Sequence, residues 1–181
     1  MTLENVWHKE FTETLFDMAS QKRLKKLSLS FVGGLMMPSF SEALAKFTGL
    51  ASLKLAKLNY AMINQSIFLD QLQTSQSLTS LHLDAIELTD EQYRQLLASL
   101  KLSDSLVQLT LSRMALDSEY KQNLFNSFLS SSRTLKGVYL DTNRLPSLEV
   151  LSQMFVNKSL HTLEIVNQNL VKNPHDSISA D

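Results

Sequence analysis

Eleven residues, LTSLHLDAIEL from Leu78 to Leu88, can be interpreted in two ways. Ser80, His82 and Asp84 occupy alternate positions, and these are the three residue types of a hydrolase triad. Leucines also run through the stretch, at positions 78, 81, 83 and 88, and they indicate a repeating structural unit instead. The rest of the chain decides between the two interpretations.

The leucine pattern recurs six times along the chain. Each copy has an aliphatic residue at its first, fourth and sixth places, and the first residues of successive copies are 26, 28, 28, 29 and 25 positions apart. Such a period is the signature of a stacked repeat architecture. The copies are LKKLSLSFVGG from Leu24, LASLKLAKLNY from Leu50, LTSLHLDAIEL from Leu78, LVQLTLSRMAL from Leu106, LKGVYLDTNRL from Leu135 and LHTLEIVNQNL from Leu160.

The fourth and sixth places of a copy lie two residues apart, so both side chains point to one face of a short strand. We expect stacked parallel strands, with Leu53, Leu81, Leu109 and Val138 in one buried column. Parallel strands need crossovers, and the intervening residues have helical periodicity. One helix is predicted after Thr89 or Asp90, with Tyr93, Leu96, Leu97 and Leu100 buried; a second after Asp117 and Ser118, with Tyr120, Leu124 and Phe128 buried; and a third from Pro146.

This alternation resembles the leucine-rich repeat, in the ribonuclease-inhibitor-like class that pairs one strand with one helix. The resemblance implies an α/β solenoid in a short horseshoe arc, with parallel strands on the concave face and helices on the convex face. We expect a single domain over residues 1–181, with an N-terminal helical cap at 1–23, about six repeats over 24–170 and a polar tail at 171–181.

One position departs from the family pattern. The usual Asn or Cys is Val32, Leu58, Ile86 and Met114 in the first four copies, and Asn143 and Gln168 in the last two. The turns after the first four strands must therefore satisfy their backbone groups in another way.

The two ends of the stack differ. Trp7, Phe11, Leu15 and Met18 form an apolar stripe that predicts a capping helix over residues 4–20. After Leu170 the chain is short and polar. A frayed tail, a piece of a longer protein, and self-association or partner docking through the C-terminal edge are all open explanations.

Composition excludes several function classes. The net charge of −1 gives no indication of nucleic-acid or membrane binding. Cysteine is absent, which excludes disulfides and thiol chemistry and suits a reducing compartment such as the cytoplasm. No apolar run approaches the roughly 18 residues of a membrane span, and no secretory signal peptide is visible at the N-terminus.

The triad interpretation of Ser80, His82 and Asp84 fails on geometry. Alternate residues of a strand are spaced about 6.6–6.8 Å along it, whereas a triad needs hydrogen bonds of about 2.6–3.2 Å. No histidine pair has metal-ligand spacing. We therefore expect no enzyme activity, no metal and no cofactor.

The outward-facing positions instead predict a protein-binding surface. Lysine and arginine exceed acidic residues by three over residues 1–60, and acidic residues exceed them by four over residues 61–181, so an oppositely charged partner would be oriented along the arc. Tyr139 is the expected anchor. The candidate contact residues are Lys26, Lys54, His82, Asp84, Gln108, Thr110, Arg113, Tyr139, Asp141 and Glu164.

The sequence thus predicts a non-enzymatic protein-interaction module that binds a protein partner on its concave face. Frequent Lys, Asn, Gln and Ser are similar to the leucine-rich-repeat effectors of intracellular bacterial pathogens, which would imply delivery into a host cell without a signal peptide. Two alternatives stay open: a small-GTPase regulator resembling the Ran GTPase-activating protein, and a targeting domain of a larger enzyme.

Overall fold

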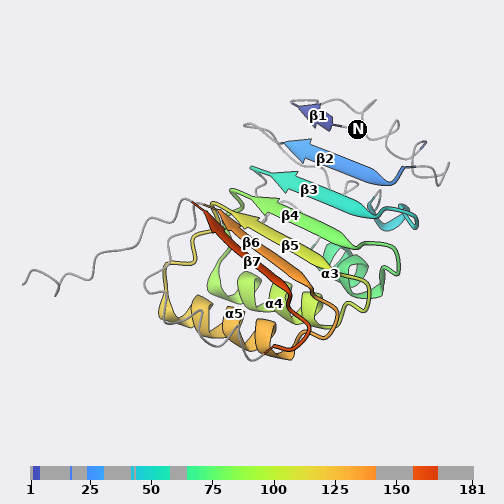
Figure 1. The fold of residues 1–181 in the computed structure, drawn as a ribbon. Helices are drawn as coiled ribbons and strands as arrows, with labels where there is room; N and C mark the ends of the chain where they lie inside the picture. The colour runs from blue at the N-terminus through green and yellow to red at the C-terminus, as the bar shows by residue number, and fades with distance from the viewer. Residues whose placement is uncertain are drawn as a thin grey trace, which may run out of the picture.

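The computed structural model describes residues 2–4, 17, 24–30, 42, 44–57, 65–141 and 157–166. Strands and helices alternate along most of this part of the chain (Figure 1). The strands are β1 (Thr2–Glu4), β2 (Lys26–Ser30), β3 (Ser52–Ala56), β4 (Ser80–Asp84), β5 (Gln108–Ser112), β6 (Gly137–Asp141) and β7 (Thr162–Val166). The helices are α3 (Gln65–Thr74), α4 (Asp90–Lys101) and α5 (Glu119–Ser131).

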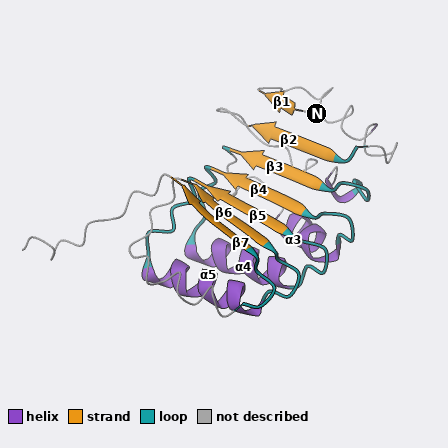
Figure 2. Ribbon diagram, viewed as in Figure 1, coloured by secondary structure: helices purple, strands orange, loops and turns teal. Residues whose placement is uncertain are grey.

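All seven strands form one parallel sheet in chain order, and α3, α4 and α5 lie on the same face of it (Figure 2). The cross-strand register confirms the predicted column: Leu53 pairs with Leu81, Leu81 with Leu109 and Leu109 with Val138. These four side chains are at most 4% exposed. The α/β class and the parallel strands are therefore as expected.

Strand β1 was not expected. It pairs in parallel with β2, with Leu3 beside Leu29, so the helical cap predicted over residues 1–23 is wrong at its first residues. Asp17 is helical; the stripe of Trp7, Phe11, Leu15 and Met18, the helix expected from Pro146 and the tail from residue 171 lie outside the described residues.

Helix α4 forms where the sequence predicts it. Thr89 is its N-cap in a capping box: the Thr89 hydroxyl accepts from Gln92 N, and the Gln92 side chain accepts from Thr89 N. The predicted stripe of Tyr93, Leu96, Leu97 and Leu100 is buried.

Helix α5 begins at the predicted cap, Ser118, but turns a different face inward. Phe125, Phe128 and Leu129 are buried, whereas Tyr120 is 47% exposed and Leu124 is only partly buried. Tyr120 lies in the first helical turn. The buried face runs through Gln122 and the residues three and seven positions after it, Phe125 and Leu129. The predicted stripe is therefore correct only at Phe128.

Of the four turns without asparagine, the three that follow β3, β4 and β5 begin with a left-handed residue directly after the strand. Lys57, Ala85 and Arg113 have φ values of 55°, 50° and 52°. Their amides donate to Asp84 O, Ser112 O and Asp141 O of the next strand. At the positions usually held by Asn, Ile86 and Met114 are instead buried apolar side chains. These backbone hydrogen bonds, from each turn to the next strand, thus take the place of the hydrogen bonds that an asparagine side chain would make.

A second ladder joins the strands at their other ends, and the sequence analysis missed it. The residue before the first leucine of each of the last four copies is Ser77, Ser105, Thr134 or Ser159. Each hydroxyl donates to backbone carbonyl groups of the preceding copy, for example Ser105 Oγ to Leu78 O at 2.9 Å. The recurrence of a hydroxyl residue at this position is visible in the sequence and could have predicted the ladder.

Candidate protein-binding face

One face of the sheet carries the three helices, and the side chains at the first, third and fifth strand positions point to the other. We call this second surface the open face. Its central row, in cross-strand register, is Ser28, Lys54, His82, Thr110, Tyr139 and Glu164. The flanking rows are Lys26, Ser52, Ser80, Gln108, Gly137 and Thr162 on one side, and Ser30, Ala56, Asp84, Ser112, Asp141 and Val166 on the other.

Nine of the ten predicted contact residues lie in these rows. The tenth, Arg113, follows β5 and its side chain reaches back to β4. Most of the nine are exposed or half-buried, but Asp84 is only 9% exposed. The Asp84 carboxylate is paired with Arg113, which lies in the turn after the neighbouring strand β5.

The Asp84–Arg113 pair is a bidentate ion pair. Arg113 Nε donates to Asp84 Oδ1 at 2.7 Å, and Arg113 Nη2 donates to Asp84 Oδ2 at 2.6 Å. The hydrogen bonds from Arg113 to Asp84 raise the pKa of the guanidinium, and the nearby Asp141 carboxylate raises it slightly further. The pair fixes the direction of the Arg113 side chain at one border of the open face.

His82 stands in the middle of the face, half-buried between Lys54 on β3 and Thr110 on β5. Its Nε2 lies 3.3 Å from Ser112 Oγ. Burial lowers the pKa of His82, and the charge of Lys54 lowers it further, against the opposing effect of Asp84.

These contacts bear on whether Ser80, His82 and Asp84 can act together as a triad. Asp84 binds Arg113 with both carboxylate oxygens, and His82 has Ser112 within hydrogen-bonding distance. Ser112 itself is only 6% exposed, so a substrate has little access to its hydroxyl. The three residues act as separate parts of a surface.

Tyr139 lies down on the sheet. A methyl group built on Gly137 would come within 3.3 Å of Tyr139 Cε2 and 3.6 Å of its hydroxyl oxygen, and within 3.7 Å of Gln108 Cγ. The ring therefore occupies the space that a side chain at position 137 would need. Gly137, which Tyr139 packs against, and Ser112, which lies beside His82, are not among the predicted contact residues. A glycine inside a strand pattern is the signal for a close approach.

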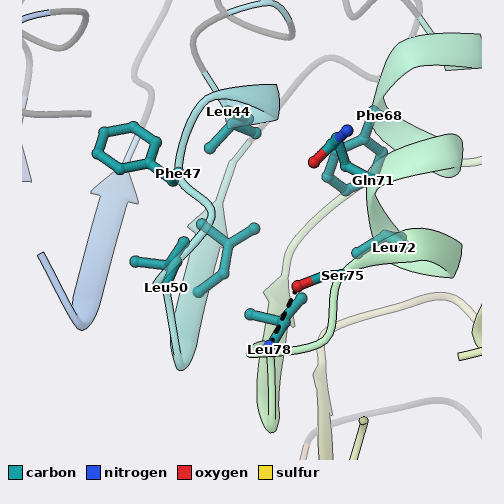
Figure 3. Close-up of a pocket in the computed structure, with 9 residues that line it drawn as sticks. Leu44, Phe47, Leu50, Phe68, Gln71, Leu72, Ser75 and Leu78 are labelled. Atoms are coloured by element: carbon teal, nitrogen blue, oxygen red, sulfur yellow. Dashed lines mark hydrogen bonds between the residues drawn. The ribbon is translucent and has the colours of Figure 1, made fainter. Parts of the chain in front are cut away.

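A small, mainly apolar pocket that is partly open to solvent lies between the turn at residues 44–50, β3 and α3 (Figure 3). Its volume is about 30 Å³, whereas pockets for small-molecule ligands measure about 300–1,000 Å³. Eight of its nine lining residues are labelled in Figure 3, with Ser75 accepting from Leu78 N at 3.1 Å. The cavity is a packing gap of about one water molecule.

Among the described residues, no group of His, Asp and Glu side chains is arranged to hold a metal ion. No described helix combines the length and apolarity that would let it cross a membrane.

Comparisons with known proteins yield a likeness in fold. No protein-family model matches the chain, and no curated protein sequence matches it. A solved structure described as "Leiomodin-1 Actin-Binding Site 2 (ABS2)" is similar, with a TM-score of 0.63 at 13% sequence identity. The match covers 80% of this chain and 88% of that one. At this identity the likeness shows the fold alone.

Proposed function

We propose that the chain is a leucine-rich-repeat domain of the ribonuclease-inhibitor-like class, without enzyme activity, whose open face is concave and binds a protein partner. The six-copy sequence pattern and the parallel sheet with helices on one side support this class. The observation that carries the function is the central row, where polar and charged side chains and one aromatic lie in register across six strands. A surface of this extent fits another protein better than a small substrate.

Site-specific photo-cross-linking tests the proposal directly. A photoreactive amino acid at Thr110 places the probe on the open face, and the same amino acid at Ala98 places it on the exposed side of α4. We expect the Thr110 probe to cross-link a defined protein and the Ala98 probe not to. The composition resembles bacterial effectors, so lysates of animal host cells are the first to test.

Variants of the open face provide the quantitative test. Tyr139→Ala and Asp141→Ala should weaken binding of the cross-linked partner, and Glu91→Ala on α4 should leave it unchanged. Equal binding by all four proteins would place the interface elsewhere.

Actin is a second candidate partner, because the similar solved structure is an actin-binding site of leiomodin-1. Co-sedimentation with actin filaments and binding to monomeric actin test it. Binding that is lost in Tyr139→Ala would identify actin as the partner, whereas no binding would remove actin and leave the search to cross-linking.

A further inference from the structure

Two basic side chains lie next to each other in the central row of the open face. Lys54 on β3 and His82 on β4 are direct cross-strand neighbours, and both are half-buried. We propose that this pair binds the carboxylate of an aspartate or glutamate side chain from the partner, and that His82 takes up a proton from solvent as the carboxylate binds. This inference rests on the proposed function and adds the chemistry and the pH dependence of one contact.

The first support is the charge of the strands that surround the pair. On β3 and β5, which flank the strand of His82, Lys54 is the one charged side chain of the open face. The others are Ser52 and Ala56 on β3, and Gln108, Thr110 and Ser112 on β5. On β4 itself the open face has one carboxylate, Asp84, and both of its oxygens accept hydrogen bonds from Arg113. On these three strands, a partner carboxylate that approaches Lys54 therefore has no unpaired carboxylate to compete with.

The second support is the hydrogen bonding of the His82 ring. Its Nε2 lies 3.3 Å from Ser112 Oγ, and its Nδ1 has no hydrogen-bond partner among the described residues. The imidazolium form has an N–H on both ring nitrogens. The protonated ring can therefore donate to Ser112 and, from Nδ1, to a bound carboxylate. The second of these bonds is charge-assisted and joins two opposite charges, which is the stronger kind.

The third support is the set of charges that act on His82. Burial lowers the pKa of His82, and Lys54 lowers it further. Asp84 and Asp141 raise this pKa, and Arg113 lowers it. A partner carboxylate beside Lys54 opposes the effect of that lysine and adds a negative charge near the ring, so the pKa of His82 is higher in the complex.

The rise in pKa makes binding depend on pH. Because the complex holds a proton on His82 more tightly than the unbound chain does, the protonated chain must bind the carboxylate more tightly in turn. Affinity should therefore increase as the pH falls from about 7.5 to about 5.5. A glutamate side chain, with a usual pKa of about 4.3, stays ionised over this range.

A single carboxylate matches the pair better than other charged groups do. Arginine or lysine would meet the like charge of Lys54. A phosphorylated side chain carries about −1.5 to −2 charge at pH 7 and is typically held by a cluster of arginines. Lys54 and His82 together supply one permanent positive charge and a second that depends on the proton, which suits one carboxylate.

Short peptides probe the site without knowledge of the partner. Acetylated and amidated Gly-Gly-Glu-Gly-Gly is titrated at millimolar concentration and constant ionic strength into the ¹⁵N-labelled full chain, at about pH 7.5 and about pH 5.5. Peptides with glutamine, lysine or phosphoserine in the central position are titrated in parallel. We expect the glutamate peptide to shift the amide signals of Lys54 and His82 and to bind more tightly at the lower pH. The glutamine and lysine peptides should not shift these signals, and added salt should weaken the glutamate peptide.

The titration of the His82 ring provides a second readout. Its imidazole signals, assigned by their loss in His82→Gln, are followed by NMR as the pH is changed. The midpoint should rise when the glutamate peptide is added and stay unchanged with the glutamine peptide. In the unbound chain, Lys54→Gln should also raise the midpoint, because Lys54 lowers the pKa of His82.

Matched variants separate the two basic groups. Lys54→Gln should weaken the glutamate peptide by about two- to fivefold at both pH values, as for a partly exposed ion pair. His82→Gln should leave the contact with Lys54 and remove the increase in affinity at low pH. Lys101→Gln makes the same charge change in the last turn of α4 and should alter neither the binding nor the His82 midpoint. The amide spectrum of each variant reports whether it is folded.

The inference is wrong if the glutamate peptide causes no shifts at Lys54 and His82, if its affinity does not increase at low pH, or if the phosphoserine peptide binds and the glutamate peptide does not. Should this happen while the Thr110 probe still cross-links a partner, the carboxylate site fails and the protein-binding function stands. If the glutamate peptide binds as expected but no partner depends on the open face, the proposed function fails instead.

Discussion

Arg113 and Asp84 are 29 positions apart, yet the guanidinium and the carboxylate form a two-point ion pair with distances of 2.7 and 2.6 Å. The pair bridges the end of β4 and the turn after β5. Its side chains are 12% exposed at Asp84 and 49% exposed at Arg113. It therefore ties successive copies together where a fully exposed pair would contribute little.

Asp84→Ala should lower the free energy of unfolding by about 1–2 kcal/mol, because a partly buried charged hydrogen-bond pair is lost and Arg113 can still be hydrated. Urea unfolding followed by circular dichroism measures the change. Glu91→Ala, which removes the exposed Glu91–Arg94 pair on α4, is the control and should have a smaller effect. Equal effects of the two substitutions would show that the Asp84 pair has no special role.

The sequence was sufficient to predict the strands because the aliphatic spacing has one physical meaning. Leu81 and Leu83 could only share a buried face, and Leu53 and Leu109 had to extend it. The open face was predictable to the same extent, since the residues between the leucines had to point the other way.

Contacts between copies were not predictable from single strands. The burial of Asp84 depends on where Arg113 points, and that depends on the left-handed backbone of Arg113. The exposure of Tyr120 likewise depends on how α5 packs against α4. Two sides of helix α5 carry apolar residues, and either could have been the buried one. Such details are set by tertiary packing and not by local periodicity.

The hydroxyl ladder makes a separate prediction. Ser105 Oγ donates to Ser75 O at 2.6 Å and to Leu78 O at 2.9 Å. Ser105→Ala leaves these partly buried carbonyls without that donor, so we expect a loss of about 1 kcal/mol in unfolding free energy. Ser127→Ala, on the exposed side of α5, is the matched control and should change stability by less than about 0.5 kcal/mol. A neutral Ser105→Ala would mean that the ladder is replaced by water.

Strain in the left-handed turns can be relieved. Ala85 has φ of 50°, a conformation that costs an L-residue about 1–2 kcal/mol and glycine little, while glycine loses about 0.5–1 kcal/mol through its greater freedom in the unfolded chain. Ala85→Gly should therefore raise the unfolding free energy by about 0.5 kcal/mol. Ala98→Gly, inside helix α4, should lower it by about 1 kcal/mol. Thermal unfolding of both variants checks the opposite signs, and a loss at position 85 would contradict the strain argument.

His82 makes stability depend on pH below neutrality. Its pKa is lowered from the usual 6.5, first by burial and then by Lys54. The unfolded chain therefore takes up a proton at a higher pH than the folded chain, and stability falls as the pH drops below about 6.5. His82→Gln should flatten the dependence of the urea midpoint between about pH 7.5 and pH 5.5, and an unchanged dependence would contradict the role of His82.

Tyr93 gives the corresponding prediction on the alkaline side. Its side chain is 1% exposed, its hydroxyl has no hydrogen-bond partner among the described residues, and burial raises its pKa well above the usual value of 10. Because the unfolded chain loses this proton first, stability should fall as the pH rises above about 10, with a limiting slope of about 1.4 kcal/mol per pH unit.

Tyr93→Phe keeps the packing and removes the unpaired hydroxyl. It should raise the unfolding free energy by about 1 kcal/mol at neutral pH and reduce the alkaline loss. Tyr120→Phe, at a 47% exposed position, should leave neutral stability unchanged. If Tyr93→Phe is instead destabilising at neutral pH, the hydroxyl must have a partner in solution, such as a buried water molecule that hydrogen-bonds it inside the helical layer.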